Sequence, residues 1–148
     1  MHASAVKSRG TWHTPPVDSV SLDYDSRHRR RIAMTGDRGL AFILDLPEAT
    51  HLRDGDGLVL EDGRIVEVRA KPEELIEITG RDPRHLAQLA WHLGNRHLAV
   101  EIDAERILIR RDHVIAHMLE HQGAIIREVV EPFDPETGAY ALIHDHGH

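Results

Sequence analysis

Two different patterns of apolar residues meet at Lys71-Pro72-Glu73-Glu74, and this change constrains the fold more than any other feature. Between Val17 and Ala70, short runs alternate apolar and polar residues as strands do, and no helical period of useful length appears. Glu61-Asp62-Gly63 separates two such runs, and Asp-Gly is a strong hairpin signal. We therefore predict an all-β first domain at residues 1–73, with residues 1–16 as a flexible arm because they lack periodicity.

The second half, residues 74–148, predicts the element order β-α-β-β-α-β. Asp82 and Asp112 have the side chain that caps helix N-termini, and apolar residues at helical spacing follow each of them. Gly94-Asn95 is expected to end the first helix. The strands are predicted at 75–79, 98–102, 106–109 and 124–130. This order indicates an α+β fold in which a ferredoxin-like domain, with two helices on one face of an antiparallel sheet, ends in a flexible tail at 132–148.

Composition excludes several classes of protein. A net charge of −7 is unfavourable for general binding of nucleic acid, and the basic run Arg27–Arg31 indicates either a handle for an acidic partner or an exposed strand edge. No apolar run reaches the roughly 18 residues of a membrane span, and the first residues lack the apolar core of a signal peptide. The cytoplasm is therefore the expected location.

Thirteen histidines and no cysteine indicate that any bound metal is held by nitrogen and oxygen, which favours nickel, copper, zinc or cobalt. His97 follows the first predicted helix, where its imidazole is either satisfied by the last helix carbonyls or available to a metal. A single imidazole binds a divalent ion weakly, so a useful site needs His97 from a second copy, as in a twofold dimer. Alternating histidines near the C-terminus can chelate an ion together, namely His144, His146 and His148.

The second predicted helix has histidines at i, i+4 and i+8, namely His113, His117 and His121. This spacing places them along one side of the helix, where neighbouring pairs can chelate an ion. We interpret His117 and His121 as part of a solvated polar face. His85 and His92, on the first predicted helix, are expected to be surface groups.

Two other functions fit parts of the pattern. His117, Glu120 and His121 match the H-x-x-E-H motif of zinc peptidases, but a small zinc hydrolase also needs a third ligand and a substrate cleft. The β-α-β-β-α-β order also underlies an RNA-recognition module that binds nucleic acid. The predicted strands at 75–79 and 124–130 lack the aromatic residues with which such modules stack on bases.

From Val17 to His148, a series of motifs resembles the UreE family of urease accessory proteins. In chain order the motifs are Asp54–Gly57, Glu61–Val68, Gly94–His97, Asp112–Val114 and Pro132–Tyr140, followed by the histidine-bearing end. Two positions depart from the family pattern. Ala99 stands where proline often follows the first histidine motif, and Arg111 stands where some members have a further histidine.

The resemblance implies a cytoplasmic homodimer that binds Ni(II) and delivers it for assembly of the urease active site. It implies no reaction of the protein's own and no catalytic residue. The implied partners are the GTPase UreG and the complex of urease apoprotein with its accessory proteins, with the β domain engaging protein partners. The family's metal ligands correspond here to His97, His113, His144, His146 and His148. Nickel is the expected cargo, and zinc or copper can bind such imidazole sites in vitro.

Overall fold

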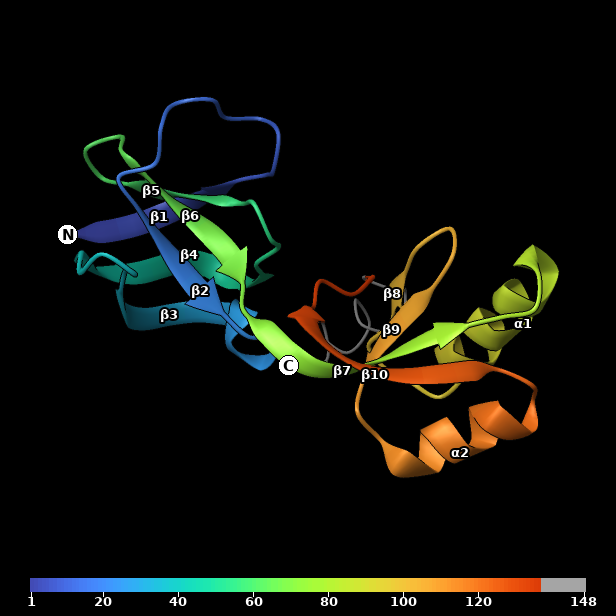
Figure 1. The fold of residues 1–148 in the computed structure, drawn as a ribbon. Helices are drawn as coiled ribbons and strands as arrows, with labels where there is room; N and C mark the ends of the chain where they lie inside the picture. Colours follow the sequence, from blue (N-terminus) through green and yellow to red (C-terminus); the bar gives the residue numbers. More distant parts are fainter. Residues whose placement is uncertain (137–148) are drawn as a thin grey trace. The chain divides into compact units, whose positions relative to one another are not determined.

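Two compact units make up the chain, Met1–Lys71 and Pro72–His148, in a computed structural model that describes residues 1–136 (Figure 1). The division follows Lys71, at the change of apolar pattern, rather than residue 73 as expected from the sequence. Among the described residues, neither helix is long and apolar enough to cross a bilayer.

The first unit is a six-stranded sheet with the strand order β2-β6-β5-β1-β4-β3 and a single short 3-10 helix, η1. Its elements are β1 His2–Lys7, β2 Asp18–Leu22, η1 Asp25–Arg27, β3 His28–Thr35, β4 Ala41–His51, β5 Gly57–Leu60 and β6 Ile65–Ala70. The all-β first half is therefore as predicted. The basic run falls mainly on β3, which is an edge strand, and this position agrees with the interpretation of a charged, exposed strand edge.

The flexible arm expected at residues 1–16 was wrong for His2–Lys7, which forms the interior strand β1. This strand pairs in parallel with β4 and antiparallel with β5, and Ala3 is fully buried. The following loop is also tied down, because Trp12 Nε1 donates to the Gly55 carbonyl at 3.2 Å. The strand was missed because backbone hydrogen bonds to two neighbouring strands hold it in place. The pattern of its own side chains does not indicate these bonds.

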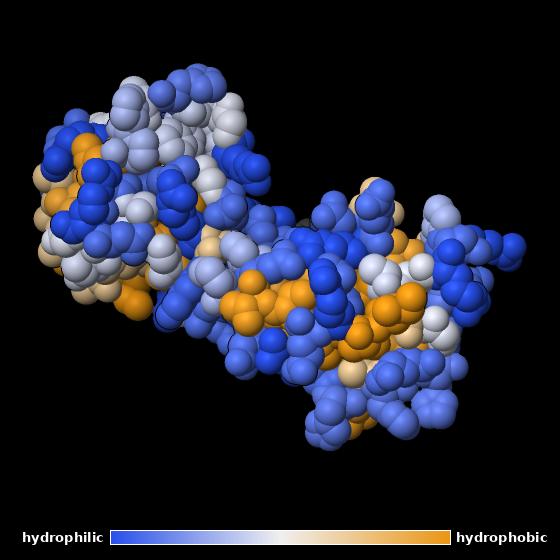
Figure 2. Space-filling view, viewed as in Figure 1, coloured by the Kyte–Doolittle hydropathy of each residue, from blue (hydrophilic) through white to orange (hydrophobic). Residues whose placement is uncertain are grey.

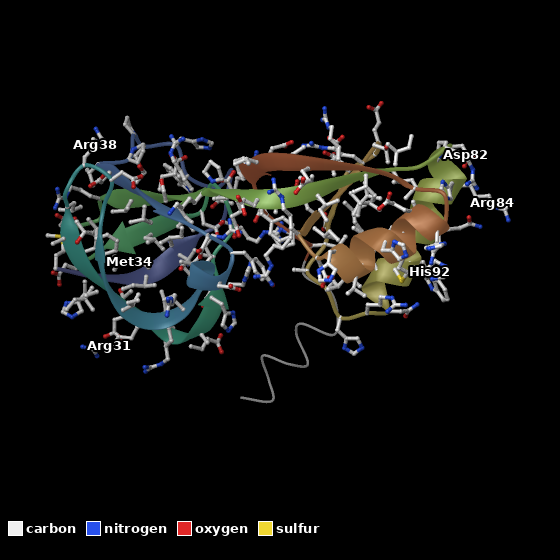
Figure 3. The ribbon with its side chains drawn as sticks, turned by 60° about the horizontal axis from the view of Figure 1, so that its bottom comes forward. Arg31, Met34, Arg38, Asp82, Arg84 and His92 are labelled. Carbon is white, nitrogen blue, oxygen red and sulfur yellow. The ribbon has the colours of Figure 1, made fainter. Side chains whose placement is uncertain are left out.

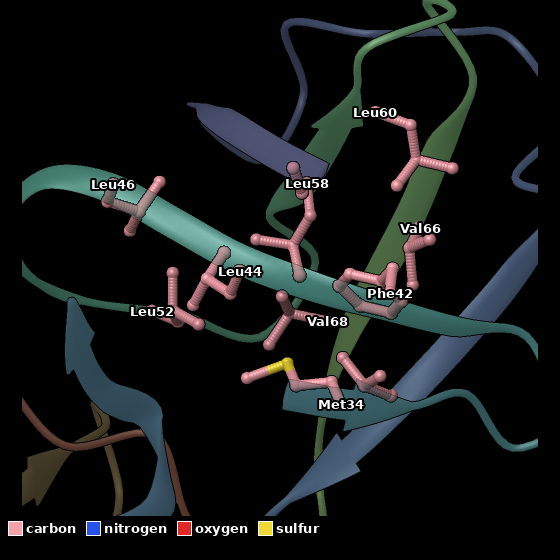
Figure 4. Close-up of a cluster of buried hydrophobic side chains, with 11 residues drawn as sticks. Met34, Phe42, Leu44, Leu46, Leu52, Leu58, Leu60, Val66 and Val68 are labelled. Atoms are coloured by element: carbon pink, nitrogen blue, oxygen red, sulfur yellow. The ribbon is translucent and has the colours of Figure 1, made fainter. Parts of the chain in front are cut away.

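Apolar side chains from six strands and the loop after β4 fill the core of the first unit (Figure 4). Apart from Met34 and Phe42 this core is aliphatic, as the low aromatic content of the chain predicts. Leu44 and Leu58 are fully buried and represent its centre. Burying a side chain of this size stabilises a fold by about 1.5–3 kcal/mol.

Strand β4 continues through Pro47 to His51, although proline has no N–H to donate to a neighbouring strand. The pairing with β3 shifts register between Arg29 and Arg31, whose partners are Thr50 and Asp45. Pro47 lies inside this irregularity, where the ladder requires no N–H from it.

The second unit contains β7 Pro72–Thr79, α1 Pro83–Gly94, β8 Glu101–Ile102, β9 Ile107–Arg110, α2 His113–His121 and β10 Ile125–Pro132. This is the predicted order, and its antiparallel sheet runs β10-β7-β9-β8. The strand predicted at 98–102 is much shorter, because only Glu101 and Ile102 pair with β9.

Both helices of the second unit pack against one face of its sheet. Ile76 and Ile78 of β7 belong to the same buried cluster as Leu89 of α1 and Leu119 of α2. Asp112 caps α2 by accepting from the Val114 and Ile115 N–H groups at 3.0 and 3.1 Å. This packing leaves the outer side of each helix facing solvent, and His92 of α1 and His113, His117 and His121 of α2 are exposed there.

Residues 133–136 are held against the second unit, although a flexible tail was expected from residue 132 onward. Phe133 is fully buried, and Asp134 N–H donates to Glu101 Oε1 at 2.7 Å. Glu136 N–H donates to the Val100 carbonyl, also at 2.7 Å. Burial of the Phe133 side chain therefore extends the folded structure past β10.

Candidate metal centre

Helix α1 positions the first candidate ligand. Asp82 Oδ1 accepts from His85 N–H at 2.7 Å, and Pro83 occupies the first helical position, where its missing N–H costs nothing (Figure 3). Leu86, Leu89 and Leu93 recur at helical spacing and are buried, which fixes the orientation of the helix on the sheet. The helix includes Gly94 and is capped by Asn95.

His97 follows this helix in a left-handed backbone conformation, with φ of 61°. Among residues 1–136 it is the only non-glycine residue with positive φ. A left-handed conformation costs an L-residue about 1–2 kcal/mol, and such strain is found preferentially at functional positions. The side chain is exposed. The helix ends at Gly94-Asn95 as predicted, and the left-handed residue is the candidate ligand His97, two residues further on.

His113 is the first residue of α2, and its side chain is exposed. It lines an open hollow together with Arg111, Asp112 and Glu128. Arg111 itself donates to the Leu75 carbonyl at 3.2 Å and so anchors the entry to α2 on β7. Arg111, which stands where some family members have a further histidine, therefore makes a structural contact of its own.

His144, His146 and His148 lie outside the described residues. Within residues 1–136, no group of three or more histidine, aspartate and glutamate side chains converges as a metal ion would require. His97 and His113 therefore do not belong to such a cluster in the described part of one chain.

The structure does bring His117 and His121 together on the exposed side of α2. Their Nε2 atoms are 3.1 Å apart, and their ring centroids are 4.5 Å apart. The sequence predicted that these residues share a side of the helix but not that their ring nitrogens meet.

His85 was expected at the surface and is instead buried, with 5% of its area exposed. Its Nδ1 accepts from the Arg81 N–H at 3.0 Å, so its Nε2 carries the proton and donates to the Gln122 carbonyl at 2.8 Å. Both ring nitrogens are thereby used in joining the start of α1 to the end of α2. Its position three residues after the helix cap Asp82 is the only local signal of this role.

The fold and the surface histidines define a two-unit α+β protein that offers imidazole ligands to solvent. Comparison with known proteins identifies the family. The N-terminal domain of the UreE urease accessory proteins matches residues 2–71, and the C-terminal domain of the same family matches residues 73–148. The chain belongs to the UreE family of urease accessory proteins.

Individual relatives agree over nearly the whole chain. Urease accessory protein UreE of Rhodopseudomonas palustris strain HaA2 is 59% identical over 98% of this chain and 67% of its own length. The UreE proteins of Bradyrhizobium sp. strain BTAi1 and of Beijerinckia indica are 58% and 55% identical, over 100% and 99% of this chain and 72% and 87% of their own lengths. The family resemblance in the sequence is therefore confirmed. These relatives are accessory proteins and not enzymes, which confirms the prediction of a non-catalytic protein and decides against the hydrolase alternative.

Proposed function

We propose that this protein is a cytoplasmic nickel metallochaperone that carries Ni(II) for assembly of the urease active site. Its central site consists of His97 from each of two copies of the chain. The observation that carries the proposal is the exposed imidazole of His97 on a strained, left-handed backbone at the end of α1. Two imidazoles leave other coordination positions to water, which lets the ion be surrendered to a recipient.

The apolar surface of the second unit supports a homodimer. Six large apolar side chains of the described part are exposed, and all but Met1 lie in the second unit: Trp91, Ile102, Val114, Ile125 and Val130. Figure 2 shows apolar side chains on one face of this unit. Exposed apolar surface of this kind is typical of protein–protein contacts, and a twofold interface would bring the same residue from both copies together.

We infer further that the second unit is a ferredoxin-like domain, because its strand order places β7 and β9 in the centre and β8 and β10 at the edges. His113 and the histidines at 144, 146 and 148 are proposed as additional ligands that raise nickel capacity. The first unit, with its basic edge strand β3, is proposed as the surface for UreG and for the complex of urease with its accessory proteins.

Nickel titration calorimetry on two His97 variants tests the central site. His97→Gly removes the imidazole and relieves the left-handed strain, whereas His97→Ala removes the imidazole and keeps the strain. Both variants should lose the tight site, with nickel affinity there reduced roughly 100-fold or more. Replacing His144, His146 and His148 by alanine should lower the number of ions bound and leave the tight site in place.

His92→Ala is the matched control, because His92 is another exposed histidine near the end of α1. It should bind nickel as the parent protein does. Unchanged tight binding in His97→Gly would contradict the proposed site, whatever the behaviour of the alanine variant.

A further inference from the structure

One pair of histidines outside the proposed shared site has the geometry of a chelate. His117 and His121 lie one helical turn apart on α2, both are exposed, and their Nε2 atoms approach to 3.1 Å. Their ring planes are inclined by 83°, so the rings do not stack, and the contact between them joins the two Nε2 atoms. One Nε2–H donates to the other Nε2 in this arrangement, and loss of that proton would leave a lone pair on each nitrogen for a metal ion beside the line that joins them.

We propose that His117 and His121 form a second metal site that a single chain provides by itself. The site takes a divalent ion of the nickel or copper type, held by two imidazole nitrogens with its remaining positions open to water. No third histidine, aspartate or glutamate of residues 1–136 completes the cluster, so the ion is held more loosely than in a closed structural site. That the ion is nickel cargo rests on the proposed function, whereas the binding itself rests on this geometry alone.

The separation of the two nitrogens agrees with adjacent ligands on one ion. With metal–nitrogen bonds of about 2.1 Å, a nitrogen separation of 3.1 Å corresponds to an angle of roughly 95° at the metal. Octahedral and square-planar ions such as Ni(II) and Cu(II) place adjacent ligands near 90°, which is close to this angle. Chelation therefore requires each ring to turn until both Nε2 lone pairs point at one ion, and the nitrogen separation already suits adjacent ligands.

Helix α2 holds the pair in place. Ile115 and Leu119 are buried on the opposite side, and the Asp112 cap closes the start of the helix. His121 lies in the last turn, where the negative end of the helix dipole favours a cation. Because the backbone is already fixed, binding an ion requires ordering of the side chains alone.

A nickel titration in a full-length background tests this site separately from the shared one. The background contains His97→Gly and alanine at residues 113, 144, 146 and 148, and it is compared with the same chain carrying His117→Ala, His121→Ala or both. Each single variant should lose roughly 100-fold in affinity, the gain expected from chelation. The double variant should lose far less than the sum of the two single losses, because either single variant already removes the chelate.

Two measurements keep the result unambiguous. His92→Ala in the same background should leave nickel affinity unchanged, and circular dichroism should show that every variant retains its helices. Nitrogen-15 spectra with Zn(II), which is diamagnetic, should show perturbed imidazole signals from His117 and His121 together. Binding that survives either single variant, or losses that simply add in the double variant, would overturn the second site. Because the background lacks His97, neither outcome bears on the shared site.

Discussion

His97 and Gly36 occupy positions that few residues tolerate, for different reasons. His97 has a left-handed backbone, whereas Gly36 has no room for a side chain because a Cβ atom there would press on the carboxylate of Asp18. That carboxylate is buried and accepts from the N–H groups of Arg38 and Leu40 at 2.9 and 3.0 Å. A buried carboxylate thus organises the turn between β3 and β4.

Gly36→Ala should destabilise the protein by about 1–3 kcal/mol, because the added methyl group must displace this buried carboxylate. Urea unfolding measures the change. Gly94→Ala is the control, since a Cβ atom there meets nothing within 4 Å, and it should leave stability unchanged or raise it by up to about 1 kcal/mol. The double variant Gly36→Ala with Asp18→Ala should lose less unfolding free energy than the two single variants lose in sum. Losses that add strictly would contradict the proposed clash.

At the scale of elements, one guanidinium joins the strands of the second sheet on the face opposite to the helices. Arg106, just before β9, donates to Glu77 of β7 at 2.9 Å and to Glu131 of β10 at 2.7 and 2.8 Å. The hydrogen bonds from Arg106 hold the pKa of both carboxyl groups below their usual range. This contact replaces apolar packing on a face that α1 and α2 leave uncovered.

These depressed pKa values predict an acid-sensitive contribution to stability. This contribution is fully present above about pH 4.3, the ordinary pKa of glutamate in an unfolded chain. It is lost as the pH falls through the lower pKa values that Glu77 and Glu131 have in the folded protein. Arg106→Gln should destabilise the protein by roughly 1–3 kcal/mol at neutral pH, and the loss should shrink toward pH 3. Thermal unfolding from pH 3 to 7 measures it. Exposed Arg84→Gln is the control, and a loss in Arg106→Gln that does not depend on pH would contradict the assignment.

Elements with strong local signals were predicted closely, and those without them were not. Helix α1 begins after Asp82 and α2 begins after Asp112, as their capping side chains indicated. Strand β1 was missed because its apolar contribution is small, with Ala3 buried and Val6 half-buried. Partner strands determine such an element, and its own sequence contains little of that information.

At the scale of the whole molecule, the proposed shared site requires two chains in one particle. Light scattering should therefore give twice the chain mass of 16.7 kDa, with the dimer persisting when nickel is removed if apolar contacts hold it together. The comparison is made with and without nickel at equal protein concentration. A particle of single-chain mass in both conditions would contradict the shared site at His97.

The sequence by itself determined the division near Lys71, both helix starts, most strands and the family, because caps, turns and apolar periods act between neighbouring residues. It also predicted the side of α2 that His117 and His121 share, since helical spacing alone fixes that. Only the tertiary structure decided that their nitrogens meet, that His85 is buried between the two helices and that Phe133 extends the fold. Rotamers, burial and long-range backbone pairing depend on groups distant in the chain, and no local pattern encodes them.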